Sequence, residues 1–290
     1  MCDKDHFEED LKKYLAEGRV TRRDFGGLAA GTGIAMMLPR AANAQAVAEK
    51  DVEIKTPDGT CDAYFVYPST GAHAAVLVWP DILGLRTAFR QMGKRLAESG
   101  YAVLTVNPFY RSKRAPVVPE GAAFDEATRG IVFPLAQQLN ATTHSSDARA
   151  FIAWLDQQPQ VDKSRKIGTT GYCMGGPIVM RTAAAVPDRV GAGGSFHGGG
   201  LTTMNPDSPH LLIPQIKAKF LIAVAENDDM RDPTSKTILK DSFAAAKLDA
   251  EIEVYPAAHG WCPPDSAVYS KDQAERAWSR MLVLFERALA

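Results

Sequence analysis

Short apolar segments alternate with helical segments along most of the chain, and this alternation limits the possible folds more than any other feature. Apolar runs predict strands at residues 74–79, 102–106, 166–170, 190–195, 220–225 and 251–255. Helical spacing predicts helices at residues 87–99, 145–158, 175–185, 236–247 and 274–289. Strands joined through helices form βαβ units, whose parallel strands are covered on both faces. We therefore expect an α/β fold with a mostly parallel central sheet and helices on both faces.

Two further segments refine this expectation. Residues 52–55 and 62–67 flank a Pro-Asp-Gly turn and predict an antiparallel hairpin ahead of the parallel strands. Residues 108–144 form a long, proline-containing connection, and connections of this length are often functional covers. We expect it to form a pocket wall, with Tyr110 and Arg111 as candidate pocket residues.

The first 44 residues have the organisation of an export signal. A charged stretch ends at Arg22 and Arg23, a glycine- and alanine-rich apolar run follows, and Ala42-Asn43-Ala44 matches a small-residue cleavage site. Paired arginines before a weakly apolar run are typical of twin-arginine signals. The alternatives are a disordered leader on a cytoplasmic protein and an uncleaved anchor.

The export reading fixes the expected domains and location. Residues 1–44 would be the signal, read by the export machinery through Arg22 and Arg23 and cleaved after Ala44. Residues 45–290 would be the mature periplasmic chain and, because no repeat or flexible linker divides them, one domain.

Charge and hydropathy exclude two classes of partner. The chain has 33 basic and 34 acidic residues, a formal net charge of −1, so it lacks the global positive field that holds nucleic acid. No apolar run reaches the ~20 residues of a membrane span. A small-molecule partner is expected. We favour a monomer, although the sequence does not settle the oligomeric state.

The cysteine count points to a functional thiol. Removal of the signal takes Cys2 away and leaves Cys61, Cys173 and Cys262. An odd number leaves at least one thiol unpaired in an oxidising compartment. Whether Cys61 and Cys262 are bridged stays open.

A candidate nucleophile lies in the segment GYCMGG at residues 171–176. Its pattern is glycine–any–nucleophile–any–glycine, placed after a predicted strand and before a predicted helix, as a nucleophile elbow requires. Cys173 would lie at the helix N-terminus, where the helix dipole favours a thiolate. The alternative is a buried structural cysteine.

A candidate acid and base follow in the order of the α/β-hydrolase triad. The acidic cluster Glu226, Asp228 and Asp229 comes directly after the strand at 220–225, where α/β sheets place their sites. His259 follows the strand at 251–255 on a loop beside a glycine. The chain order nucleophile, acid, histidine is that of the α/β-hydrolases. Each residue alone is also compatible with a structural role.

These motifs resemble the dienelactone hydrolase (carboxymethylenebutenolidase) family. The resemblance extends over nearly all of residues 50–289 and rests on the segments 80–85, 100–104, 171–176, 226–228 and 258–260. It implies an α/β-hydrolase fold and hydrolysis of ester or lactone bonds without a cofactor. No zinc-binding spacing is present, so no metal is expected.

The resemblance also implies roles for particular residues. The family's triad falls on Cys173 as nucleophile, His259 as base and Asp228 as the acid that orients the imidazole, with an acyl-enzyme intermediate. The backbone amide of Met174, which follows the nucleophile, and by resemblance that of Ile82 would form the oxyanion hole.

Two positions depart from the family pattern. Asp81 stands where the family has a glutamate that contacts the resting cysteine, so Asp81 is a possible resting-state partner of Cys173. Pro263 stands where an arginine helps to hold a substrate carboxylate, and candidate substitutes lie in the long connection: Arg111, Arg114 and Arg129. We therefore expect neutral esters or lactones to be hydrolysed at least as well as carboxylated ones.

The remaining candidates are pocket residues. His197 follows the strand at 190–195 and is expected at the pocket edge, and Trp261 lies beside His259. Three readings of the function compete: a dienelactone hydrolase-like enzyme, a thioesterase or general carboxylesterase with the same machinery, and a non-catalytic periplasmic binding protein. An intact nucleophile, acid and base together favour an enzyme.

Overall fold

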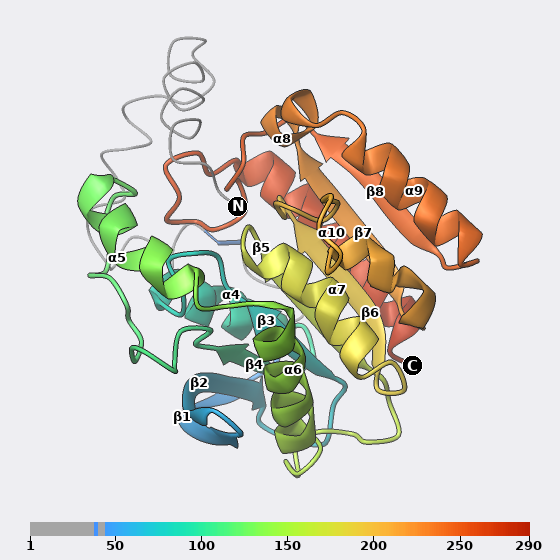
Figure 1. The fold of residues 1–290 in the computed structure, drawn as a ribbon. Helices are drawn as coiled ribbons and strands as arrows, with labels where there is room; N and C mark the ends of the chain where they lie inside the picture. The colour runs from blue at the N-terminus through green and yellow to red at the C-terminus, as the bar shows by residue number, and fades with distance from the viewer. Residues whose placement is uncertain (1–37, 40–43) are drawn as a thin grey trace.

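The computed structural model describes residues 38, 39 and 44–290, and an eight-stranded sheet forms their centre (Figure 1). In chain order the strands are β1 (Val47–Thr56), β2 (Gly59–Pro68), β3 (Ala75–Trp79), β4 (Ala102–Val106), β5 (Ile167–Tyr172), β6 (Val190–Phe196), β7 (Lys219–Ala225) and β8 (Ala250–Tyr255). Their spatial order is β1-β2-β4-β3-β5-β6-β7-β8. The predicted export signal at residues 1–44 falls almost entirely outside the described residues.

The pairing confirms the predicted mixture of one hairpin with a parallel sheet. Strands β1 and β2 pair antiparallel around the predicted turn, and β2 pairs antiparallel with β4. From β4 through β8 every neighbouring pair is parallel. The carboxyl ends of the parallel strands therefore meet at one edge, where this fold class places its sites.

Helices cover both faces of the sheet, as the alternation predicts (Figure 1). One face is covered by α4 (Thr87–Glu98) and α10 (Lys271–Ala288), which bury an apolar cluster that includes Phe89, Met281 and Phe285. The other face is covered by α6 (Ala141–Leu155), α7 (Gly175–Ala185), α9 (Ser235–Ala245) and the 3₁₀ helix η1 (Pro209–Gln215). The central strands β3, β4 and β5 are buried along their whole length, which explains their continuous apolar or small-residue character.

The sequence patterns predicted neither α5 nor α8 nor the 3₁₀ helix η1. Helix α5 (Glu126–Ala136) lies inside the long connection and contains Pro134. Pro134 lies in the last turn of α5, and Asp125 caps the other end by accepting the Thr128 amide N–H at 2.9 Å. Helix α8 (Glu226–Arg231) contains the acidic cluster predicted as a strand-end loop.

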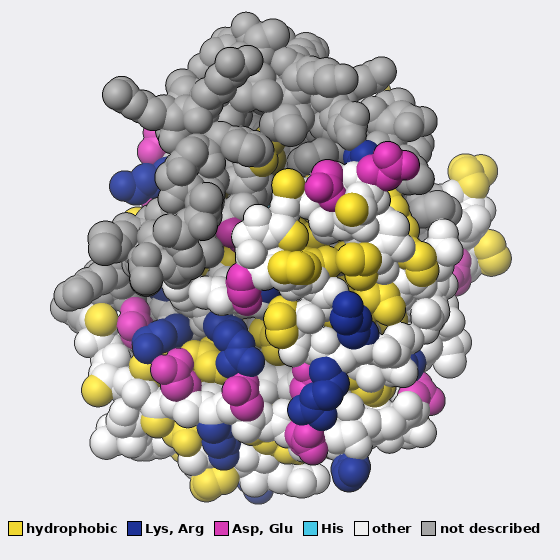
Figure 2. Space-filling view, turned by 90° about the vertical axis from the view of Figure 1, so that its left-hand side faces the viewer, with side chains coloured by type: hydrophobic (Ala, Val, Ile, Leu, Met, Phe, Trp, Pro, Cys, Tyr) yellow, Lys and Arg dark blue, Asp and Glu magenta, His cyan; other side chains and the backbone are white. Residues whose placement is uncertain are grey.

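The surface agrees with the near-zero net charge. Figure 2 shows Lys and Arg side chains interspersed with Asp and Glu side chains on one face of the molecule, without a patch of one sign. In the part of the chain that the structure describes, no helix is long and apolar enough to cross a membrane.

Candidate active site

The segment around Cys173 forms a sharp turn between β5 and α7. Cys173 has a left-handed backbone with φ of 51°, which a non-glycine residue adopts only under tertiary constraint. A Cβ on Gly171 would lie 2.2 Å from the Gly175 carbonyl oxygen, and one on Gly175 would lie 2.4 Å from the Trp79 carbonyl oxygen. The glycines of the motif are therefore required by backbone packing against β3 and within the turn.

Cys173 is held at the beginning of α7 and is 6% exposed. Its amide N–H donates to the Phe196 carbonyl oxygen and to Nδ1 of His197, each at 3.1 Å. Met174 follows at the N-cap position of α7, with its backbone already helical. The structure thus places the predicted nucleophile and one predicted oxyanion donor at a helix N-terminus on the carboxyl edge of the sheet.

The predicted acid and base lie in contact on two neighbouring strand ends. Nδ1 of His259 lies 2.6 Å from Oδ2 of Asp228, and the His259 amide N–H donates to Oδ1 of Asn227 at 2.8 Å. Asp228 lies on α8, directly after β7, and His259 follows β8. Asp229 faces elsewhere and binds Lys236 Nζ at 2.6 and 2.7 Å. Of the acidic residues predicted here, Asp228 is the one bonded to the histidine.

His197 and Trp261 are both buried against this pair. The His197 ring is 5.2 Å from the His259 ring and 4.9 Å from the Trp261 ring, centroid to centroid, in edge-on contacts. Trp261 is fully buried and stacks on Tyr255. Both residues thus support the histidine loop from within the protein, and His197 alone also contacts the Cys173 backbone.

Asp81 has different partners from the one expected. Its carboxylate accepts two hydrogen bonds from Arg86, at 2.7 and 3.0 Å, and one from the Leu83 amide N–H at 2.9 Å. Arg86 also binds Asp265, on the loop that follows His259, through both carboxylate oxygens at 2.5 and 2.9 Å. Burial raises the pKa of Asp81, and the guanidinium opposes that rise. The aspartate therefore anchors the loop that carries Ile82, instead of contacting Cys173.

Tyr110 and Arg111 both bond to the hairpin and to α6. The Tyr110 hydroxyl contacts the Thr56 hydroxyl and donates to Asp147, each at 2.7 Å. Arg111 binds Asp147 on α6 and Asp58 in the β1–β2 turn. These bonds tie the start of the long connection to the hairpin and α6, and a role of either residue in a pocket stays a prediction.

Apolar residues of the long connection pack directly on the predicted oxyanion donors. Ile82 forms a buried apolar cluster with residues of this connection, and Met174 packs against its edge. The buried members from the connection are Phe109, Val117, Val118 and Val132. Arg129, on the same helix as Val132, is 7% exposed and lies 5.9 Å from the Phe124 ring centroid. The connection is therefore an apolar wall above the elbow, with one arginine in it.

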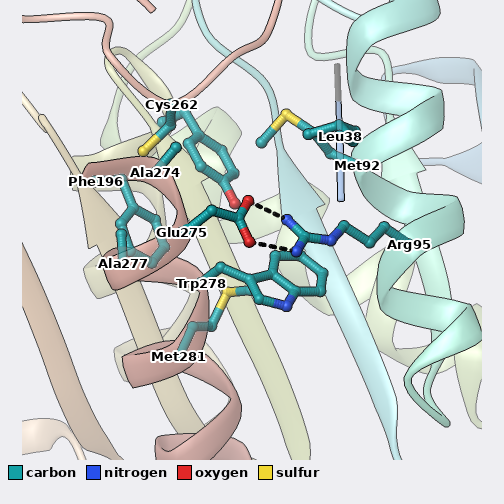
Figure 3. A pocket seen from close by; sticks show the side chains of 11 residues that line it. Leu38, Met92, Arg95, Phe196, Cys262, Ala274, Glu275, Ala277, Trp278 and Met281 are labelled. Carbon is teal, nitrogen blue, oxygen red and sulfur yellow. Dashed lines mark hydrogen bonds and ion pairs between the residues drawn. The ribbon is translucent and has the colours of Figure 1, made fainter. Parts of the chain in front are cut away.

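Two hollows elsewhere in the described residues lack all three predicted catalytic residues. The first, between α4 and α10, has a volume of about 30 Å³ and is shown in Figure 3 with its Arg95–Glu275 ion pair beside Trp278. That volume suits a single water molecule. The second is a charged surface groove of about 420 Å³ between β1, β2 and α4, crossed by the Arg90–Asp51 and Lys94–Glu49 ion pairs.

Cys61 and Cys262, whose pairing the sequence left open, are not bridged to each other. Cys61, Cys173 and Cys262 are all buried, and Cys61 and Cys262 belong to apolar clusters on opposite faces of the sheet. Burial raises the pKa of the Cys61 and Cys262 thiols. Among the described residues, no three His, Cys, Asp or Glu side chains are grouped to hold a metal ion.

Comparison with known proteins places this geometry in a family. The sequence pattern of the dienelactone hydrolase family matches residues 61–289. The carboxymethylenebutenolidase of Pseudomonas putida is 26% identical over 238 residues, covering 80% of this chain and 93% of the relative. That of Rhodococcus opacus is 27% identical over 243 residues, covering 81% and 90%.

Solved structures share the fold. A dienelactone hydrolase-like promiscuous phosphotriesterase from metagenomic libraries superposes with a TM-score of 0.70 at 22% identity, covering 84% of this chain and all of the other. The two proteins share the arrangement of strands and helices. The chain therefore belongs to the dienelactone hydrolase family and is an α/β-hydrolase-fold hydrolase of ester or lactone bonds.

Proposed function

We propose that this protein hydrolyses esters or lactones through an acyl-enzyme on Cys173, with His259 and Asp228 completing the triad. The observation that carries the proposal is the contact of Asp228 with His259 Nδ1 at 2.6 Å, beside a cysteine held in a left-handed turn at a helix N-terminus. The bond to Asp228 orients the imidazole and makes Nε2 the nitrogen that exchanges protons.

Acylation begins when the Cys173 sulfur attacks the acyl carbonyl carbon as a thiolate, whose proton His259 has taken. The carbonyl oxygen becomes an oxyanion, which the amide N–H groups of Met174 and Ile82 would stabilise. Collapse of the tetrahedral adduct breaks the bond to the alcohol oxygen, and His259 donates its proton to that leaving oxygen. An ester releases its alcohol, whereas a lactone stays attached as a hydroxyacyl group.

Deacylation repeats the sequence with water. His259 removes a proton from water, the hydroxide oxygen attacks the thioester carbonyl, and the carbon–sulfur bond breaks. His259 then returns its proton to the Cys173 sulfur, so the products are the carboxylic acid and the restored cysteine. Asp228 stabilises the imidazolium in both halves and is not itself protonated.

The proposed substrates are neutral, with an apolar acyl group. The wall above the elbow is built from apolar side chains around Ile82 and Val132. Of the arginines expected to substitute for the one missing at Pro263, Arg111 is committed to Asp58 and Asp147, and Arg114 binds Glu53 at the exposed hairpin. Arg129 is the candidate that lies in the wall.

A comparison of two substrates tests this preference. A charge-assisted hydrogen bond to a carboxylate contributes about 1.5–3 kcal/mol, or roughly 10- to 100-fold in kcat/KM. We expect a neutral methyl ester of a lactone acid to be hydrolysed at least as well as the free acid, in the wild type and in Arg129→Ala. A strong wild-type preference for the free acid that collapses in Arg129→Ala would refute neutral specificity.

The mechanism is tested with matched aspartate variants. Cys173→Ala and His259→Ala should reduce hydrolysis to background, and Asp228→Asn should lower kcat by at least ~100-fold. Asp229→Asn is the control, because Asp229 binds Lys236 and should leave kcat within about twofold. Mass spectrometry of quenched reactions should find the acyl group on Cys173. Wild-type kcat/KM in Cys173→Ala would exclude the proposed mechanism, and substrate binding without hydrolysis would favour a binding protein.

We also propose that the enzyme is exported and acts in the periplasm. The support is the sequence: paired Arg22 and Arg23, the weakly apolar run and the cleavage site ending at Ala44. The mature chain should begin at Gln45, and replacing both arginines by lysine should retain the precursor in the cytoplasm. N-terminal sequencing of fractionated cells decides between this outcome and a full-length cytoplasmic protein.

A further inference from the structure

Two non-glycine residues that are neighbours in space have left-handed backbones. Cys173 has φ of 51° and His197 has φ of 39°. Strands β5 and β6 are paired in parallel with Tyr172 opposite Phe196, so each residue is the first one beyond a paired strand end. Strained backbone that recurs at two adjacent strand ends requires tertiary support.

The His197 ring supplies part of that support. Its Nδ1 accepts the Cys173 amide N–H at 3.1 Å, alongside the Phe196 carbonyl oxygen. The His197 amide N–H donates to the Ala223 carbonyl oxygen on β7 at 2.8 Å. The residue is 1% exposed, so its backbone and its ring are both fixed.

The same ring also contacts the proposed base. The edge-on contact with His259, at 5.2 Å between centroids, lies next to the contact with Trp261. His197 thus touches the backbone of the nucleophile and the imidazole of the base. Its side chain therefore connects Cys173 to His259.

The protonation state of His197 follows from these contacts. A nitrogen that accepts an N–H hydrogen bond carries no proton, so a neutral His197 has its proton on Nε2. Burial lowers the pKa of His197, and positive charge on His259 lowers it further. His197 therefore stays neutral when His259 becomes an imidazolium, and it does not compete for the proton that catalysis moves.

We propose that His197 is a positioning residue: its unprotonated Nδ1 holds the Cys173 amide in the strained turn and so sets the thiol against His259 for acylation. The inference rests on the proposed function and adds a residue to it. Loss of the Nδ1 acceptor would misplace the sulfur and the adjoining Met174 amide, and it would therefore lower kcat more than it changes KM.

A pair of variants separates the effect of the Nδ1 hydrogen-bond acceptor from the effect of the aromatic ring. In His197→Asn the side-chain oxygen can take the place of Nδ1, and asparagine tolerates a left-handed backbone. In His197→Phe the ring against His259 and Trp261 is kept, but the acceptor is lost. We expect His197→Phe to lower kcat about tenfold or more with KM changed less than about threefold, and His197→Asn to retain kcat within about threefold.

The control for general loss of packing is Phe243→Leu, a buried core substitution on α9 away from the site. It should lower stability and leave kcat unchanged. Wild-type kcat in His197→Phe, or equal losses in His197→Asn and His197→Phe, would overturn the positioning role. Cys173→Ala is assayed in parallel. Residual hydrolysis in Cys173→Ala would refute the proposed function. If Cys173→Ala is inactive and His197→Phe has the kcat of the wild type, only this inference is refuted.

A measurement on protein that retains His197 keeps the test independent of the folding of the His197 variants. Nitrogen-15 NMR of labelled histidines should find two buried imidazoles with the proton on Nε2 that do not titrate between pH 5 and 9, because Arg181 donates to Nδ1 of the buried His144 as well. The signal that disappears in His144→Asn belongs to His144, and the signal that remains is that of His197. If both His197 variants fail to fold, the spectrum of His144→Asn decides alone. Absence of a non-titrating Nε2–H imidazole from that spectrum would overturn the proposal.

Discussion

Replacing Arg86 by methionine would leave two buried carboxylates without their shared cation. Arg86 is 4% exposed at its side chain and binds Asp81 and Asp265, which are 12% and 10% exposed. Removing one partner of a buried ion pair costs about 3–5 kcal/mol, because an uncompensated charge remains. For a domain of this size that loss lowers Tm by roughly 6–20 °C. We therefore expect Arg86→Met to be strongly destabilised at pH 7.

The pH dependence of this penalty follows from Asp81. Burial raises the pKa of Asp81, and the variant lacks the guanidinium that opposes the rise. A carboxyl whose pKa is higher in the folded protein than in the unfolded chain stabilises the fold at low pH, and that contribution is lost as the pH rises through the folded-state pKa. The difference in stability between Arg86→Met and the wild type should therefore be smaller at pH 5 than at pH 7.

Urea unfolding of the mature chain at both pH values measures the effect. The control is Arg90→Met, which removes the exposed ion pair of Arg90 with Asp51 and should cost less than about 1 kcal/mol. Adding Asp81→Asn and Asp265→Asn to Arg86→Met should recover part of the loss, since no charge then remains buried. A penalty below 1 kcal/mol at pH 7, or one that grows toward pH 5, would refute the reasoning.

Three other predictions concern the elbow, a buried histidine and the thiols. Gly175→Ala should abolish activity and destabilise the fold, because the new Cβ would lie 2.4 Å from the Trp79 carbonyl oxygen; wild-type turnover would contradict this. Burial lowers the pKa of His144 from 6.5 to about 3, so the unfolded chain binds the extra proton between these values and stability falls as the pH drops through this range. His144→Asn keeps an acceptor for Arg181 and should flatten the stability slope between pH 7 and 5 by up to ~1.4 kcal/mol per pH unit, whereas equal slopes would contradict it. Thiol titration of the denatured mature chain should count three thiols, and a count of one would indicate a bridge.

The sequence alone determined the features that repeat locally. Buried strands between helices give apolar runs at short intervals, so the parallel sheet and the hairpin were predictable, with element ends shifted by a few residues. The turn at Cys173 was also recognisable from its local sequence, because the glycines around Cys173 stand where the turn admits no side chain. The order of Cys173, Asp228 and His259 follows from the strand order, and it suggested the contact between Asp228 and His259 that the structure contains.

Only the tertiary structure decided which charged residues serve the site and which brace the fold. Arg86 binds Asp265 across 179 residues of sequence, and Arg111 binds Asp58 across 53. Local sequence patterns do not predict hydrogen-bond partners over such separations. The same limit hid the link from His197 to the Cys173 amide, which exists because β5 and β6 end side by side. Local sequence patterns report periodicity and turn chemistry, whereas hydrogen bonds between distant loops depend on how the sheet brings its strand ends together.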